Sequence, residues 1–174
     1  MADDIRALAD EYFEYTNAEE PTTAHMRGDY RYMDRFEDLS RSAEDARIAR
    51  LREFAARARS FEDRSLSSDD LTTKETLVWD AETAAAVAET RQSEFFVDPT
   101  FGLHVVLQVY TPQMTVPQPE HAEMMVAKYR SIAAAIDQLT ERHPTLAAHL
   151  DNCVRTGTYC SYRPDPLLRV DWSF

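Results

Sequence analysis

Only three of the 174 residues are glycine, whereas alanine is abundant. Alanine is the best helix former and is depleted in strands, so this balance favours helix over sheet. A chain of this length is most simply one domain, long enough to bury a core of its own. The sequence therefore predicts a mostly helical globular protein.

Apolar residues recur at the spacing of an amphipathic helix in four long stretches. These stretches cover residues 3–19, Ser42 to a break at 63–67, Ser67 to about 96, and 119–142. Two serine–aspartate pairs resemble capping boxes at the start of the second and third stretches: Ser42 with Asp45, and Ser67 with Asp70. Pro144 interrupts the fourth stretch, which can resume over 145–155.

Between the first two helices, Pro21 can start a short turn of helix, because the N–H that it lacks would be unpaired there anyway. Gly28 is placed to end that turn in a left-handed conformation. Residues 29–40 then follow no period.

The fourth helix is expected to turn one apolar face inward. That face comprises Ala122, Met125, Val126, Tyr129, Ile132, Ile136 and Leu139. Residues 98–119 are the least helical part, and within them LHVVLQVY (103–110) fits a short helix or a strand equally. The predicted fold is all-α: a bundle of long antiparallel helices with one irregular segment around 98–119. We expect one domain over 1–157, followed by an unplaced tail over 158–174.

The net charge of −12 argues against nucleic acid and anionic membranes as partners. No apolar run is long enough to span a bilayer, and the N-terminus is acidic where a signal peptide would be basic. Cys153 and Cys160 are the only cysteines, which is no disulfide framework. These features predict a cytoplasmic protein with reduced thiols.

The sequence shows little support for catalysis. The five histidines form no His-Glu-x-x-His motif, and no Gly-x-Ser-x-Gly elbow or glycine-rich phosphate loop is present. His149 and Cys153 lie one helical turn apart, which leaves open a metal site or, more simply, a half-buried helix end. His121, in the first turn of an acidic helix, is predicted to be solvated.

The stretch from Glu20 to Ser40 is dense in charge and in aromatic rings. Aspartate and arginine alternate there, with rings between them: Asp29, Tyr30, Arg31, Tyr32, Asp34, Arg35, Phe36 and Asp38. Such aspartates can cap turns, and such arginines can bind carboxylates. The stretch is therefore either an ordered polar connector or a loop that contacts a ligand.

The same stretch resembles the N-terminal signature of the bacterial DUF885 family. The matching pattern is Pro21-Thr22-x-Ala24-x-x-x-Gly28-Asp29, then Tyr32-x-Asp34-Arg35-x-x-Asp38-x-Ser40. Further segments are similar in the same order: LSSDDLTTKETL (66–77), DPTFGLHVVLQ (98–108), VPQPEHAEMMVAKYRSIAAAIDQ (116–138) and, more weakly, LDNCVRTG (150–157). The family pattern implies an acidic residue at position 121, where this chain has histidine.

The resemblance implies a mostly helical relative of zinc metallopeptidase-like hydrolases. The presumed zinc motif of longer relatives, His-Glu-x-x-Pro-Gly-His, has no match here, so no catalytic residue, metal ligand or cofactor is expected in this chain. The resemblance points to six ligand-contacting residues: Gly28, Asp29, Tyr32, Asp34, Arg35 and His104.

Three functional hypotheses follow. The chain can be the N-terminal wall or lid of a metallopeptidase-like cleft standing alone, and inactive. It can be a module that binds a peptide or small ligand without catalysis. It can also be a non-functional remnant, whose exposed apolar helix faces would be covered by forming a homodimer.

Overall fold

The computed structural model describes residues 4–91, 105, 109–142, 154–155 and 161–162, with α6 side chains described as far as Ile132. The all-α prediction is confirmed, since long helices make up most of the described chain. The helices are α1 (Ile5–Glu19), α2 (Pro21–Met26), α3 (Arg41–Arg59), α4 (Ser68–Glu89) and α6 (Pro119–Arg142). The 3-10 turns are η1 (Tyr30–Tyr32), η2 (Asp63–Ser65) and η4 (Thr111–Gln113). Two short strands, β1 (Val154–Arg155) and β2 (Ser161–Tyr162), pair antiparallel.

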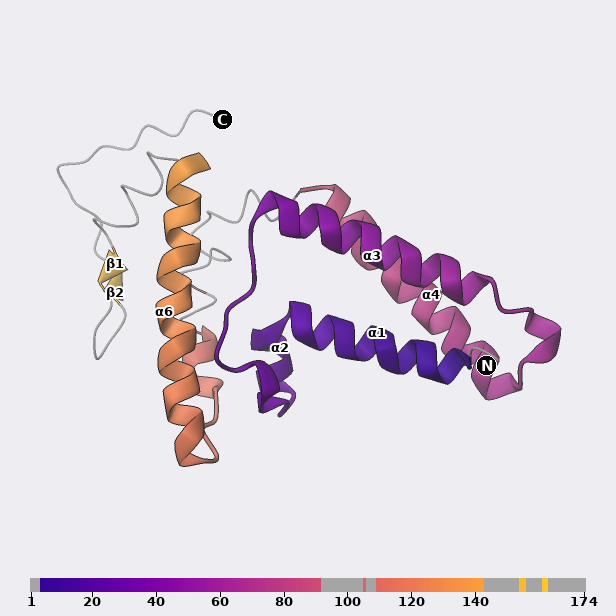
Figure 1. The fold of residues 1–174 in the computed structure, drawn as a ribbon, viewed down its shortest axis with the longest axis horizontal. Coiled ribbons are helices and arrows are strands. Elements are labelled where there is room, and N and C mark those ends of the chain that lie inside the picture. Colours follow the sequence, from indigo (N-terminus) through magenta and orange to yellow (C-terminus); the bar gives the residue numbers. More distant parts are fainter. Residues whose placement is uncertain (1–3, 92–104, 106–108, 143–153, 156–160, 163–174) are drawn as a thin grey trace.

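Helices α1, α3 and α4 run alternately in opposite directions and form one packed layer, as Figure 1 shows. In the same view α6 stands across the end of this layer where α2 lies. The segment between Pro21 and Ser40 thus lies between the layer and α6. Within the irregular segment, residues 98–104 and 106–108 lie outside the described residues, as does the tail 158–174 apart from Ser161 and Tyr162.

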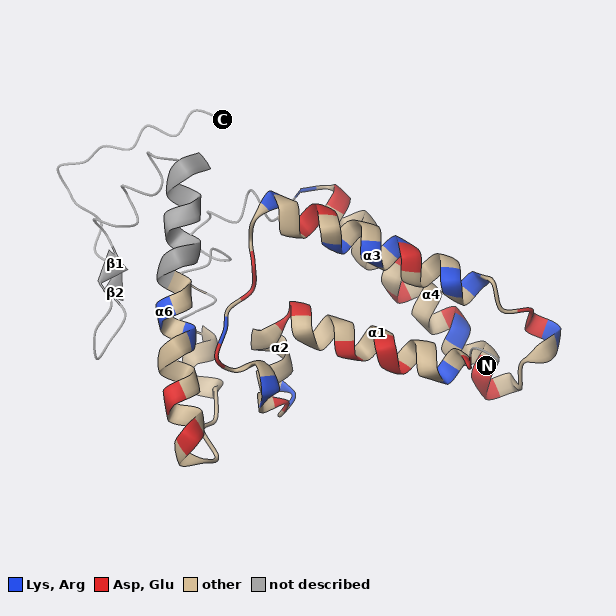
Figure 2. Cartoon of the chain, in the orientation of Figure 1, with Lys and Arg blue, Asp and Glu red and all other residues tan. Residues whose placement is uncertain are grey.

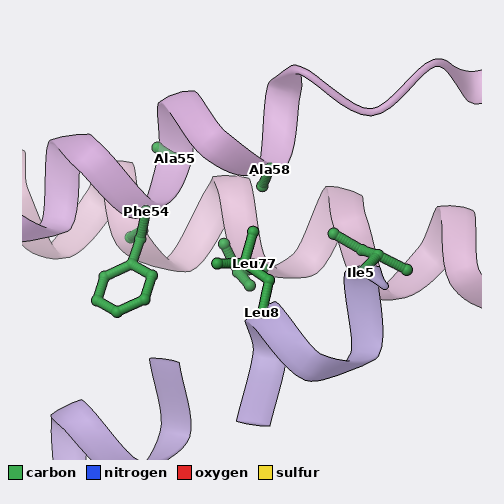
Figure 3. Packing of buried hydrophobic residues seen from close by; sticks show 7 residues of the cluster. Ile5, Leu8, Phe54, Ala55, Ala58 and Leu77 are labelled. Carbon is green, nitrogen blue, oxygen red and sulfur yellow. The ribbon is translucent and has the colours of Figure 1, made fainter. Parts of the chain in front are cut away.

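The core forms where α1 meets the α3–α4 pair (Figure 3). It contains Ile5, Leu8, Phe54, Ala55, Ala58, Leu77 and Ala81, each no more than 4% exposed. The small side chains Ala58 and Ala81 are fully buried, which lets the backbones of α3 and α4 approach closely. Ala85 on α4 is fully buried as well.

Side-chain caps explain where α1, α3 and α4 begin. Asp4 accepts a hydrogen bond from the Arg6 N–H, and Ser67 accepts one from the Asp70 N–H, as predicted. The prediction that Ser42 caps α3 is wrong. Ser40 is the cap, because its backbone is extended and its Oγ accepts from the Ala43 N–H, so α3 begins earlier.

The predicted length of α4 is also wrong. The helix ends at Glu89 rather than near residue 96. Arg91 adopts a left-handed backbone with φ of 56°, which cannot continue an α-helix. The Arg91 guanidinium binds the carboxylates of Glu44 and Asp45, and these two contacts hold the turn against α3.

The inward face of α6 differs from the prediction. Val126 and Tyr129 are 49% and 41% exposed, and Ala122 is exposed as well. The buried stripe is Met125, Lys128 and Ile132, while the side chains of Ile136 and Leu139 lie outside the description. Apolar residues occupy two neighbouring stripes of this helix, and the fold buries the stripe that carries a lysine.

Charged side chains of both signs line α1, α3 and α4 (Figure 2). Glu11 on α1 accepts from Arg50 at 2.7 Å and from Arg57 at 2.6 and 2.9 Å, so it joins α1 to α3. Arg57 holds the pKa of the Glu11 carboxyl below its usual value, with Arg50 adding to the effect. No helix in the described part of the chain is long and apolar enough to cross a membrane.

Replacing Glu11 with glutamine should lower the Tm at pH 7 and should make the Tm fall less as the pH is lowered. Because the folded-state pKa is depressed, the stabilisation is present above the unfolded pKa of glutamate and is lost as pH falls through the folded pKa. Thermal melts between pH 3 and 7 check this, since the two Tm curves should converge at the acidic end. Glu75→Gln is the control, because Glu75 is exposed and makes no ion pair within the described residues. A constant Tm difference across the pH range would contradict the prediction.

Candidate functional site

The segment from Pro21 to Ser40 is shaped by its own local bonds. Pro21 starts α2, and Gly28 follows its end with φ of 90°, both as predicted. The Glu37 carboxylate serves in place of an N-terminal cap, accepting from the Thr22 N–H at 2.7 Å and from the Thr22 Oγ at 2.9 Å. The chain therefore folds back on α2 before α3 begins.

Three rings join this segment to the start of α6. The His25 ring contacts the Tyr30 ring edge-on, with centroids 5.4 Å apart, and Tyr30 stacks on His121 at 5.0 Å. The Nε2 of His25 lies 2.8 Å from the carbonyl oxygen of Thr115, and the Tyr30 hydroxyl lies 2.9 Å from the Thr115 Oγ. His25 is only 2% exposed, whereas Tyr30 and His121 are half-buried, and together these contacts join α2 and η1 to the residues ahead of α6.

A second contact lies two turns further along α6. Lys128 is 1% exposed, and its ammonium lies 5.9 Å from the centre of the Phe36 ring. The Phe36 N–H donates to the Ser131 Oγ at 3.1 Å, and that hydroxyl donates to the Lys128 carbonyl. Burial lowers the pKa of the Lys128 amine, and the nearby Glu37 charge partly opposes that shift.

We call these two contacts together the junction: His25, Tyr30, Phe36, Thr115, His121, Lys128 and Ser131. Within the described residues, four buried polar side-chain atoms lack a hydrogen-bond partner: Asn17 Nδ2, His25 Nδ1, His121 Nδ1 and Lys128 Nζ. Three of the four belong to the junction. Asn17 lies behind it on α1, with its Oδ1 accepting from Arg27 at 3.2 Å.

The tautomer of His25 follows from its partner. A carbonyl oxygen only accepts, so the Nε2 of His25 carries a proton, and in the neutral ring Nδ1 is a free acceptor. The junction therefore offers a buried ammonium and two imidazole nitrogens for hydrogen bonding. Among the described residues of the junction, no nucleophile is hydrogen-bonded to a basic side chain.

Five of the six residues predicted to contact a ligand lie on the loop between α2 and α3, beside the junction. Asp29 is bound by the Arg31 guanidinium at 2.6 Å, which lowers the pKa of its carboxyl. Tyr32 lies under the guanidinium of Arg35, at 4.9 Å. Asp34 and Arg35 are exposed, as is Gly28, and His104 lies outside the described residues.

Sequence reasoning missed the inward-facing members of the junction. The prediction that His121 is solvated is wrong, because its ring stacks on Tyr30 and its Nδ1 is buried. A usable signal was present for Lys128, since it lies between Met125 and Ile132 at helical spacing, where a lysine interrupts an apolar stripe.

The described residues do not fit the zinc ion that the family resemblance implies for longer relatives. Among them, no three His, Cys, Asp or Glu side chains lie close enough together to hold a metal ion. The metal site considered at His149 and Cys153 stays a prediction. Both of these residues lie outside the described part of the chain, as do His143 and Cys160.

Comparison with known proteins settles the family. The family model DUF885, described as a bacterial protein of unknown function, matches residues 21–155. The chain belongs to the DUF885 family. A search of curated proteins found no match, and a search of solved structures also found none. The DUF885 match begins at the first residue of α2 and includes every residue of the junction.

Proposed function

We propose that this DUF885 chain is a helical module that binds a peptide or small ligand at the junction, without catalysing a reaction itself. One observation supports this above all: of the four buried polar side-chain atoms without a partner in the described residues, three belong to the two contacts that make up the junction. A buried polar atom left without a partner costs about 1–3 kcal/mol, so such atoms are rare in folded proteins. A bound ligand would supply the missing partners.

Family membership suggests where such a module would act. The resemblance implies relatives that are zinc metallopeptidase-like, and we propose that the module forms part of the wall of their substrate cleft. Its own described residues supply no metal ligands, so it would contribute substrate contacts and not the hydrolytic step. Peptide turnover by the purified chain, abolished by a chelator, would contradict a purely binding role.

A thermal-shift screen of short peptides and small organic acids tests the proposed site. A ligand that binds the junction should raise the Tm of the wild type, and His121→Leu should lose that shift because it removes a ring nitrogen of the junction. Glu123→Leu is the matched control, as Glu123 is an exposed residue on the same helix.

The same screen compares the junction with the loop surface predicted from sequence. Substituting both Asp34 and Arg35 with alanine should leave the shift in place, since both side chains point to solvent. Loss of the shift in that double variant, with the shift retained in His121→Leu, would move the site to the outer surface of the loop.

The homodimer stays a prediction. The exposed face of α4 carries Trp79 and Val87, which are 67% and 56% exposed, and α1 exposes Phe13 at 53%. Sedimentation of the purified chain measures whether it forms the dimer that would cover these side chains.

A further inference from the structure

Lys128 is buried in a position from which its charge cannot reach water. Lysines are almost never fully buried unless they are paired, and those near a surface extend their ammonium into solvent. Here Met125 and Ile132, three residues before and four after, are 9% and 6% exposed, so Lys128 lies in the middle of the buried stripe of α6. The Lys128 Nζ atom itself is buried and has no hydrogen-bond partner in the described residues.

The groups around the ammonium are already committed to other partners. Both Glu37 oxygens accept from Thr22, at 2.7 and 2.9 Å, and Glu37 forms no ion pair with Lys128 within the described residues. The Ser131 hydroxyl gives its proton to the Lys128 carbonyl and accepts from the Phe36 N–H. The Phe36 ring, at 5.9 Å, is at the outer limit of about 6 Å for a cation–π contact.

The missing partner has a definite chemistry. An ammonium has three donors and no acceptor, and carboxylates are its strongest common partners among acidic organic groups. The Lys128 ammonium is a single positive charge, and the negative charge of Glu37 lies nearby. A singly charged anion therefore suits this position better than a phosphate dianion does. Met125, Ile132 and the Phe36 ring make the surroundings apolar, so the bound molecule needs an apolar portion next to its acidic group.

We infer that the ligand bound at the junction carries a carboxylate attached to an apolar body, and that the Lys128 ammonium receives this carboxylate. This inference rests on the proposed binding function. The carboxylate is either the C-terminus of a peptide or that of a small organic acid. In the absence of ligand, the unpaired ammonium destabilises the fold, which is a common property of binding sites.

The test measures ligand-induced Tm shifts with matched probes on the full chain. The probes are the acetylated tripeptide of alanine as its free acid and as its C-terminal amide, together with hexanoate and hexanamide. At about ten times Kd, an acid that binds should raise the Tm by about 3–6 °C, and the uncharged amides should not. A shift with the tripeptide acid alone identifies peptide C-termini, and a shift with hexanoate alone identifies small acids.

Lys128→Met separates a binding role from a structural one. Methionine has similar length and no charge, so this variant should lose the acid-induced shift and, without ligand, melt at a higher temperature than the wild type. Arg130→Met removes the same charge from an exposed position on α6 and should keep both the wild-type Tm and the acid-induced shift. A lower Tm for unliganded Lys128→Met would show that the ammonium already has a partner, and would overturn the inference.

The outcomes distinguish this inference from the proposed function. If acids and amides shift the Tm equally, and His121→Leu abolishes both shifts, the junction binds ligands but Lys128 does not select a carboxylate. If neither acids nor amides bind, the inference is wrong, while the proposed function is decided separately by the wider screen of peptides and organic acids. Loss of acid binding in Arg130→Met would indicate a general effect of charge and would also overturn the assignment to Lys128.

Discussion

Phe54→Ala is expected to lower the free energy of unfolding by about 3–5 kcal/mol, because it empties a fully buried aromatic position. Phe54 on α3 is 0% exposed. Its ring contacts those of Tyr12 and Tyr15, with centroids 5.3 and 5.5 Å apart, and lies under the guanidinium groups of Arg50 and Arg57 at 4.6 and 5.6 Å. The truncation therefore removes aromatic and cation–π contacts together with the buried area.

Urea denaturation followed by circular dichroism measures this loss. Trp79→Ala is the matched control, since it deletes a larger aromatic side chain from a site that is 67% exposed, and it should change stability by no more than about 0.5 kcal/mol. Similar losses in the two variants would mean that Phe54 does not anchor α1 to α3. Among the described residues, the ring and cation–π contacts of Phe54 involve no residue of the junction, so ligand binding should survive wherever Phe54→Ala remains folded.

The parts of the fold that could be predicted depend on neighbours in sequence. Pro21 starts α2 and Gly28 ends it because of their own backbone chemistry, and Ser67 caps α4 through a bond to Asp70. Helical periodicity, which also depends only on nearby residues, correctly predicted that α6 spans 119–142. The cap of α3 was misplaced because Ser40 and Ser42 are equally suitable residues, and only the extended backbone at Ser40 distinguishes them.

The junction could not be predicted because its partners are distant in sequence. His25 bonds to Thr115, and Phe36 to Ser131, across separations of 90 and 95 residues. The charged residues that drew attention in sequence, Asp34 and Arg35, lie on the exposed side of the same loop. Local pattern identified the correct segment, but only the fold shows which side of it meets α6.

The buried face of α6 was mispredicted because the surface that covers it is also distant in sequence. Val126 and Tyr129 are apolar and well spaced, yet they are exposed, because the loop Pro21–Ser40 meets the stripe next to theirs. A pattern of apolar residues cannot decide between two adjacent stripes when the partner surface is unknown. The lysine within the buried stripe is then unfavourable for packing, which is the reason to assign it a role in binding.

Tyr30→Ala is expected to detach α6 from the rest of the molecule while leaving the α1–α3–α4 layer folded. Tyr30 stacks on His121 at 5.0 Å, contacts the His25 ring at 5.4 Å, and hydrogen-bonds to Thr115. Losing two aromatic contacts and one hydrogen bond should weaken the attachment by about 2–3 kcal/mol. Amide hydrogen exchange should therefore become roughly 30- to 150-fold faster in the first turns of α6, with no change in α3 and α4.

Tyr30→Phe separates the two kinds of contact. It keeps both ring contacts and removes only the hydroxyl bonded to Thr115, so exchange in α6 should quicken by a factor of about 10 or less. Because Lys128 lies two turns further along the same helix, a detached α6 also separates its ammonium from Phe36. Tyr30→Ala should then lose any ligand-induced Tm shift that Tyr30→Phe retains. Equal acceleration of exchange in α3, α4 and α6 would show instead that the molecule opens as one cooperative unit, with no separate junction.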